Sequence, residues 1–213
     1  MDSREYFDRV APRWDTMRQA LFSERVREKA YTVAGLKEGQ LAVDVGADTG
    51  LLTEGLLQRG LSVIAVDLSE AMLAELKQKL ADPDGLDCRV GKAEHLPVDE
   101  NAADHVFGNM VLHHVGEPST AIQEMVRALK PGGKLVLTGM GEHPFEFLRT
   151  EQHDRWLGFR RDDVRRWFLA AGLLQVTVDC VGECCCAASE GTGEVASVTL
   201  FVAAGTKADG QAL

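Results

Sequence analysis

An apolar run that ends in a glycine-containing turn, followed at a fixed interval by an acidic residue, constrains the fold of this chain most. Residues 43–50 read VDVGADTG, and a second apolar run, residues 63–66, ends at Asp67, 21 residues after Gly46. This spacing is typical of a β-turn-α-β unit that binds a nucleoside. Glycine lets the backbone turn tightly, and an ionised Asp67 would accept strong hydrogen bonds from two ribose hydroxyls. A βαβ turn without a ligand is the alternative interpretation.

The turn departs from the pattern that binds a dinucleotide. That pattern is G-x-G-x-x-G, whereas residues 46–50 read GADTG and place Asp48 at the position of the second glycine. A carboxylate at this position repels a pyrophosphate but tolerates or attracts a cation. The turn therefore argues against a phosphate-bearing dinucleotide.

Composition indicates an ordinary globular protein. A chain of 213 residues, 45% apolar and 26% charged, is long enough for one domain with a substantial core. The net charge of −10 and the lack of a basic stripe argue against a nucleic-acid partner. No long apolar run predicts a membrane span, and the polar N-terminus does not resemble a signal peptide. Five cysteines, mostly clustered, do not resemble a secreted disulfide framework, so we expect a cytoplasmic protein.

Hydrophobic periodicity predicts how the chain is organised. Residues 1–36 are predicted to be helical and amphipathic, and short β-type runs then alternate with helical patterns. Helix starts are predicted at the capping residues Ser69, Ser119 and Asp162, and a further helix near 50–58. The predicted strands are 41–45, 62–66, 86–90, 104–110, 134–138, 173–181 and 195–204.

This alternation predicts an α/β fold. Strands separated by helices form a parallel sheet with helices on both faces. The last two strands are joined by a loop too short for a crossover, so they should be antiparallel neighbours. We therefore expect a Rossmann-like, seven-stranded, mostly parallel sheet with an antiparallel last strand. The whole of residues 1–213 would form one domain, in which 1–36 is a lid and 205–213 a flexible tail.

Several ordered segments resemble those of the class I S-adenosylmethionine-dependent methyltransferases of the type 11 group. Besides the glycine turn and Asp67, residues 91–97 read GKAEHLP and residues 129–135 read LKPGGKL. The segment YFDRVAPRWD, residues 6–15, is similar to the opening of quinone-biosynthesis methyltransferases. The resemblance implies S-adenosylmethionine as cofactor and in-line transfer of its methyl group to a small-molecule acceptor. Asp48 and Lys92 stand where the family usually has glycine and aspartate.

The resemblance also implies which residues hold the cofactor. The methionine end would lie against the glycine turn, the ribose against Asp67, and the methyl group beside the end of the fourth strand. Aromatic residues of the predicted lid would cover the sulfonium, because aromatic faces attract cations; core packing of these residues is the alternative. The implied cofactor residues are Tyr6, Trp14, Asp44, Gly46, Ala47, Gly50, Asp67, Leu68, Ala93, Glu94, Asn109 and Met110.

Two histidines follow the fourth predicted strand, near the expected position of the acceptor. His113 or His114 would serve as the catalytic base if the acceptor is protonated, since histidine titrates near neutrality. The alternative is that the pair orders the loop before Gly116. His143 and His153 lack any metal-ligand spacing, so no metal site is predicted.

The sequence leaves two other functions open. Cys184, Cys185 and Cys186 are predicted to lie in the loop between the last two strands, and soft thiolates suit thiophilic elements. A methyltransferase for an element such as arsenic(III) is therefore one alternative, although consecutive residues in a strand point in opposite directions. The second is a non-catalytic S-adenosylmethionine-binding regulator, which the departures at Asp48 and Lys92 motivate.

Overall fold

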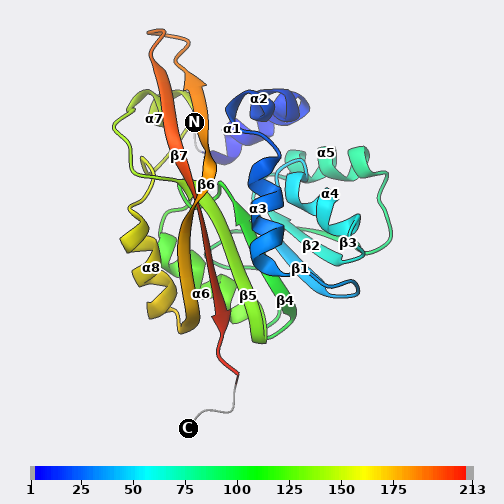
Figure 1. The fold of residues 1–213 in the computed structure, drawn as a ribbon. Helices are drawn as coiled ribbons and strands as arrows, with labels where there is room; N and C mark the ends of the chain where they lie inside the picture. The colour runs from blue at the N-terminus through cyan, green and yellow to red at the C-terminus, as the bar shows by residue number, and fades with distance from the viewer. Residues whose placement is uncertain (1–2, 210–213) are drawn as a thin grey trace.

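Seven strands form one sheet in the order β3-β2-β1-β4-β5-β7-β6, as Figure 1 shows. The computed structural model describes residues 3–209. β7 is antiparallel to both of its neighbours, and the remaining pairs are parallel, which confirms the predicted fold class. The strands are Leu41–Val45 (β1), Ser62–Asp67 (β2), Leu86–Val90 (β3), Ala103–Asn109 (β4), Leu129–Met140 (β5), Leu173–Ala188 (β6) and Val195–Lys207 (β7).

Helices cover both faces of the sheet. One apolar cluster joins α6 and α8 to one face, while α3, α4 and α5 pack on the other. None of the helices in the described part of the chain is long and apolar enough to cross a membrane. The helices are Ser3–Val10 (α1), Trp14–Leu21 (α2), Arg25–Ala34 (α3), Leu51–Leu57 (α4), Glu70–Leu80 (α5), Pro118–Ala128 (α6), Phe147–Glu151 (α7) and Arg161–Ala170 (α8), with a 3₁₀ turn at Ala11–Arg13.

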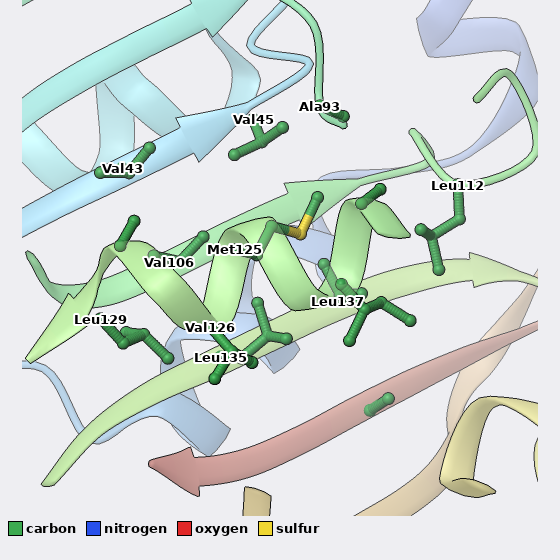
Figure 2. Packing of buried hydrophobic residues seen from close by; sticks show 14 of the residues in the cluster. Val43, Val45, Ala93, Val106, Leu112, Met125, Val126, Leu129, Leu135 and Leu137 are labelled. Atoms are coloured by element: carbon green, nitrogen blue, oxygen red, sulfur yellow. The ribbon is translucent and has the colours of Figure 1, made fainter. Parts of the chain in front are cut away.

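Alternation along each central strand supplies both apolar layers. In Figure 2, Met125 of α6 lies over Val106 of β4, beside Leu135 and Leu137 of β5. The next residue of β4, Phe107, belongs to the cluster on the opposite face. Because successive side chains of a strand point to opposite faces, consecutive apolar residues of a central strand serve both layers.

One of the three predicted helix caps is confirmed. The Ser69 hydroxyl accepts a hydrogen bond from the Met72 N–H at 3.1 Å. The other two caps are wrong: α6 already begins at Pro118, whose fixed φ suits the first helical position, and α8 begins at Arg161. Asp162 instead lies in the first turn of α8, where its carboxylate interacts favourably with the positive end of the helix dipole.

The C-terminal hairpin is longer than predicted. β6 continues to Ala188 and β7 to Lys207, so residues 189–194 are the connection and the cysteines 184–186 lie on a strand, not in a loop. Residues 205–207 of the predicted tail are likewise part of β7, because β7 pairs with β5 and β6 along this stretch. Residues 210–213 lie outside the described residues.

The N-terminal helices divide into two groups. α1 and α2 lie above the carboxyl ends of the parallel strands (Figure 1). α3 belongs to the body of the fold, since Ala30, Tyr31 and Ala34 are buried against the sheet. The predicted lid, 1–36, is therefore too long at its C-terminal end, because the apolar face of α3 packs on the strands.

Packing between α3 and α4 offers a test of this arrangement. The Tyr31 hydroxyl donates to the Leu52 carbonyl at 2.6 Å, and a Cβ at Gly55 would lie 2.6 Å from the same hydroxyl. We expect Gly55→Ala to lower the free energy of unfolding by about 1–3 kcal/mol because of this clash. The clash outweighs the higher helix propensity of alanine, which by itself would stabilise the helix by about 1 kcal/mol. Urea unfolding measures the change. In a double-mutant cycle, Tyr31→Phe should relieve part of the cost; strict additivity would contradict the clash.

Candidate active site

A cavity of about 580 Å³ opens at the carboxyl ends of the parallel strands. Its floor includes Val45, Asp67 and Asn109, at the ends of β1, β2 and β4. Phe7 and Trp14, from α1 and α2, contribute the roof. The volume is within the range of small-molecule sites, and open α/β sheets bind ligands in this crevice.

The glycine turn after β1 is fixed by the neighbouring strand. The N–H groups of Gly46 and Ala47 both donate to the Val66 carbonyl, at 2.8 and 3.1 Å. Gly46 has φ +69°, and a Cβ there would lie 2.7 Å from Val111 Cγ2. Only glycine satisfies both constraints, so the turn presents bare backbone to the cavity.

Asp67 is held in place by two backbone donors. Its Oδ1 accepts from the Ser69 N–H at 2.8 Å and its Oδ2 from the Asp48 N–H at 3.0 Å. Burial raises the pKa of Asp67 to about 6, although these hydrogen bonds oppose the rise. The Leu68 backbone also hydrogen-bonds to this group. Because a carboxylate offers about four acceptor positions, acceptor capacity remains for a ligand hydroxyl.

Two further carboxyl groups lie beneath and beside the turn. Asp44 is buried; its Oδ2 accepts from the Thr53 hydroxyl at 2.7 Å, and its Oδ1 has no hydrogen-bond partner among the described residues. Burial raises the pKa of Asp44 to about 7. Asp48 has φ +45° and accepts from the Gly50 N–H at 3.1 Å, and burial raises its pKa too. Three acidic groups so close together favour a ligand that carries positive charge.

The roof of the cavity is aromatic, and the end of β4 is polar. The Phe7 ring meets the Trp14 ring edge-on, with centroids 5.4 Å apart. The Tyr6 hydroxyl donates to Gln152 Oε1 at 3.1 Å and so ties α1 to the segment after α7. At the end of β4, Asn109 Oδ1 accepts from the Thr138 hydroxyl at 2.7 Å.

The opposite wall carries the adjacent histidines. The His113 and His114 rings have centroids 4.1 Å apart, and each contributes a nitrogen 3.8 Å from Asp154 Oδ1. Burial lowers the pKa of both histidines and raises the pKa of Asp154 to about 7. The wall is completed by Cys185, which lies on the part of β6 that pairs with β7 beyond the end of β5.

The comparisons with known proteins agree with this geometry. The methyltransferase domain family matches residues 43–137. A demethylmenaquinone methyltransferase of Thermobifida fusca is 32% identical over 163 residues, which are 74% of this chain and 67% of that protein. Its counterpart from Renibacterium salmoninarum is 37% identical over 147 residues, 68% of this chain and 61% of that protein. The chain belongs to the class I S-adenosylmethionine-dependent methyltransferases.

Solved structures of this fold serve different chemistries. Phosphoethanolamine N-methyltransferase 2 of Haemonchus contortus, in complex with S-adenosyl-L-methionine, has a TM-score of 0.70 at 18% identity and covers 86% of this chain and 52% of its own. The [4+2]-cyclase SpnF has a TM-score of 0.74 at 16% identity and covers 97% and 95%. These likenesses concern the fold alone. The chain also spans only about 61% and 54% of the Renibacterium and Paenarthrobacter aurescens relatives.

The cavity fits the cofactor of this methyltransferase family. The cradle at Gly46 leaves no space for a side chain, and Asp67 keeps free acceptor positions at the end of β2. Asp44 Oδ1, buried and unpaired, lies below the place where a positively charged methionine end would rest. Such orphaned acceptors are costly unless a ligand compensates them.

The structure brings most of the predicted site residues to this cavity. Those that line it are Trp14, Gly46, Asp67, Leu68, Ala93, Glu94, Asn109, Met110, His113 and His114. Tyr6, Asp44, Ala47 and Gly50 do not line it but support residues that do. Gln152, Asp154, Arg155 and Cys185 line the cavity without having been predicted. They lie on a connection and a hairpin extension that carry no sequence motif, so only the folded structure shows that they line the cavity.

Asp44 makes the stability of the cofactor-free methyltransferase depend on pH. Because its pKa is raised on folding, the folded state binds more protons than the unfolded state between about pH 4 and 7, and stability falls as pH rises through this window. We expect Asp44→Asn to reduce the loss of unfolding free energy between pH 5 and pH 8 by about 1–3 kcal/mol. Urea unfolding at both pH values measures it. Asp179→Asn, at an exposed position of β6, is the control, and an unchanged pH dependence in Asp44→Asn would contradict the assignment.

Proposed function

We propose that the protein transfers the methyl group of S-adenosylmethionine to a small-molecule acceptor, and that the cavity holds both. The observation that carries this proposal is the state of Asp67, which backbone N–H groups orient while leaving acceptor capacity for a ligand. Such a carboxylate suits the paired hydroxyls of a ribose. The family, and relatives that bear the name of a quinone methyltransferase, support the rest.

Neighbouring residues would receive the other parts of the cofactor. Leu68, Ala93 and Glu94 line the cavity beyond Asp67, where the adenine would lie. Glu94 is already engaged, since its Oε1 accepts from the Gly116 N–H at 2.8 Å. Therefore we expect Glu94 to position the adenine pocket through the loop of Gly116, with its second oxygen toward the base.

The methionine end would rest on the glycine turn. Gly46 provides backbone at close range, and Asp44 and Asp48 provide negative charge for the amino group. The Asp48 carboxylate would thus attract the cofactor, because its sulfonium and its ammonium group are both cationic. Trp14 lines the roof above, where its ring would attract the sulfonium.

The chain has to align and shield the reacting groups. S-adenosylmethionine supplies a methyl group that its sulfonium already activates. The protein's own contribution is to hold the acceptor in line with that methyl group and to exclude water. Asn109, fixed by Thr138, and Met110, at φ +54°, end β4 beside this position. α1 and α2 cover it, with Phe7 between Trp14 and His114.

The acceptor would lie between the methyl group and the wall formed by the segment 140–160 and the β6 extension. Met140, Leu148 and Cys185 make this part of the cavity apolar, whereas Asp154 and Arg155 add polar groups. A small acceptor with an apolar body and one reactive polar atom fits such a lining. The proposal that His113 or His114 takes a proton from it stays a prediction.

Asp67 provides the first test of the proposed function. Asp67→Ala removes the acceptor for both ribose hydroxyls, and hydrogen bonds to charged groups contribute about 1.5–3 kcal/mol each. We therefore expect S-adenosylhomocysteine to bind at least about 100-fold more weakly. Calorimetric titration measures the affinity. Asp179→Ala, which removes an exposed carboxylate from β6, should bind like the parent.

Unweakened binding by Asp67→Ala would place the cofactor elsewhere. If the parent protein binds the cofactor but converts none across a panel of oxygen, nitrogen, sulfur and carbon nucleophiles, the non-catalytic regulator replaces the enzyme. That comparison matters because the [4+2]-cyclase shares the fold.

The cysteine tract provides a second test, of the thiophilic-element alternative. Cys184 and Cys186 are exposed, while Cys185 is buried in the cavity wall, so the three thiols do not converge on one ion. We expect Cys184→Ser with Cys186→Ser to leave S-adenosylhomocysteine affinity and the methylation of arsenite, if any is detected, unchanged. A loss of arsenite methylation in this double variant, measured by chromatography of methylated arsenic, would revive that alternative.

A further inference from the structure

Two adjacent histidines and an aspartate distant in the sequence meet in the cavity wall, and the proposed methyl transfer assigns no role to the aspartate or to the three residues as a unit. His113 Nε2 and His114 Nδ1 each lie 3.8 Å from Asp154 Oδ1. The three atoms all lie within 4.8 Å of one another. The histidines follow β4 and the aspartate follows α7, so the fold brings together segments about 40 residues apart.

Direct hydrogen bonds do not explain this cluster. A separation of 3.8 Å exceeds the 2.7–3.2 Å of a protein hydrogen bond. His113 Nδ1, His114 Nδ1 and Asp154 Oδ2 are buried without a partner among the described residues. Only 6% of the His113 side chain and 2% of the Asp154 side chain are exposed. Buried polar atoms left unpaired are costly. Of these three atoms, His114 Nδ1 is the one that faces Asp154 Oδ1, so a group bound between the two would compensate it.

We propose that His113, His114 and Asp154 bind a divalent transition-metal ion, and that Zn²⁺ is the ion that the donor set fits best. Two imidazoles and one carboxylate are ligands that Zn²⁺ takes at catalytic sites. With bonds of about 2.0–2.2 Å, ligand atoms around a tetrahedral ion lie about 3.3–3.5 Å apart. The two separations of 3.8 Å therefore require a contraction of about 0.3–0.5 Å, and the third pair of ligand atoms, which lies within 4.8 Å, requires at most about 1.5 Å.

The surroundings of the cluster prepare it for an ion. The backbone of His153 hydrogen-bonds to the His114 ring and so orients the imidazole, whose Nδ1 faces Asp154. Burial keeps both imidazoles neutral, as coordination requires. The backbone N–H of Asp154 donates to the Leu148 carbonyl and fixes that segment.

Three protein ligands leave a coordination position open, and all three residues line the cavity. In this arrangement the fourth position takes a water molecule or a heteroatom of a bound small molecule. Metal binding itself requires neither cofactor nor acceptor; that an oxygen or sulfur of the acceptor occupies the fourth position rests on the proposed function. No metal site is predicted from the sequence, and no local spacing links Asp154 to the histidine pair about 40 residues earlier.

Titration of Zn²⁺ into chelator-treated protein tests the site. We expect one ion per chain, a rise in Tm of about 5–10 °C when free Zn²⁺ exceeds Kd about 100-fold, and at least about 100-fold weaker binding by Asp154→Asn and His114→Ala. Co²⁺ in place of Zn²⁺ should give visible absorption bands that both variants lose. His95→Ala and the Cys184→Ser, Cys186→Ser double variant, changed only at exposed positions, should bind like the parent.

Failure of the parent to bind Zn²⁺, undiminished binding by Asp154→Asn, or loss of binding in the cysteine double variant would each overturn the proposal. Asp154→Asn and His114→Ala are first shown to unfold cooperatively without metal; if one does not fold, the other decides. Parallel titration with S-adenosylhomocysteine separates the two proposals. Zn²⁺ binding without cofactor binding would overturn the proposed function alone, and the reverse would overturn the metal site alone.

Discussion

The two hydrogen bonds from the Gly46 and Ala47 N–H groups to the Val66 carbonyl determine how the rest of the site is arranged. They hold the turn after β1 against the end of β2. Gly46 adopts the positive φ of this turn because it has no Cβ, and Val111 occupies the space that a Cβ would need. The same contact fixes Asp48, whose N–H then orients Asp67. One backbone turn therefore sets the start of α4, the direction of an acidic side chain and the floor of the cavity.

The second half of the cavity depends on strand length. β7 pairs with β5 only as far as Leu200, opposite Met140, and beyond this point its earlier residues pair with β6 alone. This free-standing part of the hairpin places Cys185 and Ala187 against Phe22 and Leu148. Apolar packing between hairpin, N-terminal segment and α7 thus closes a site whose other side is built from the sheet. The cofactor half of such a cavity can stay constant while the acceptor half varies with these connections.

The sequence predicts the β-turn-α-β side of the cavity because local rules govern its fold. Alternating apolar runs specify the strands, and the interval from Gly46 to Asp67 follows from the length of one βαβ unit. The acceptor half depends on contacts between distant segments, such as Asp154 beside His114, that no local pattern encodes. The cysteine tract shows the same limit. Its alternation was foreseeable, but its place on a strand was not, because strand length there is set by pairing with β7.

Buried acidic groups connect the stability of this protein to its ligands. Burial raises the pKa of Asp44, Asp67 and Asp154, so each destabilises the ligand-free fold when it is ionised. An apolar sequence would avoid this cost, but it would not attract a cationic cofactor or a metal ion. Ligand binding raises the free energy of unfolding again, since a ligand that binds only the folded state stabilises it. If the proposed sites hold, the carboxylates that weaken the empty protein are the groups that would bind its ligands.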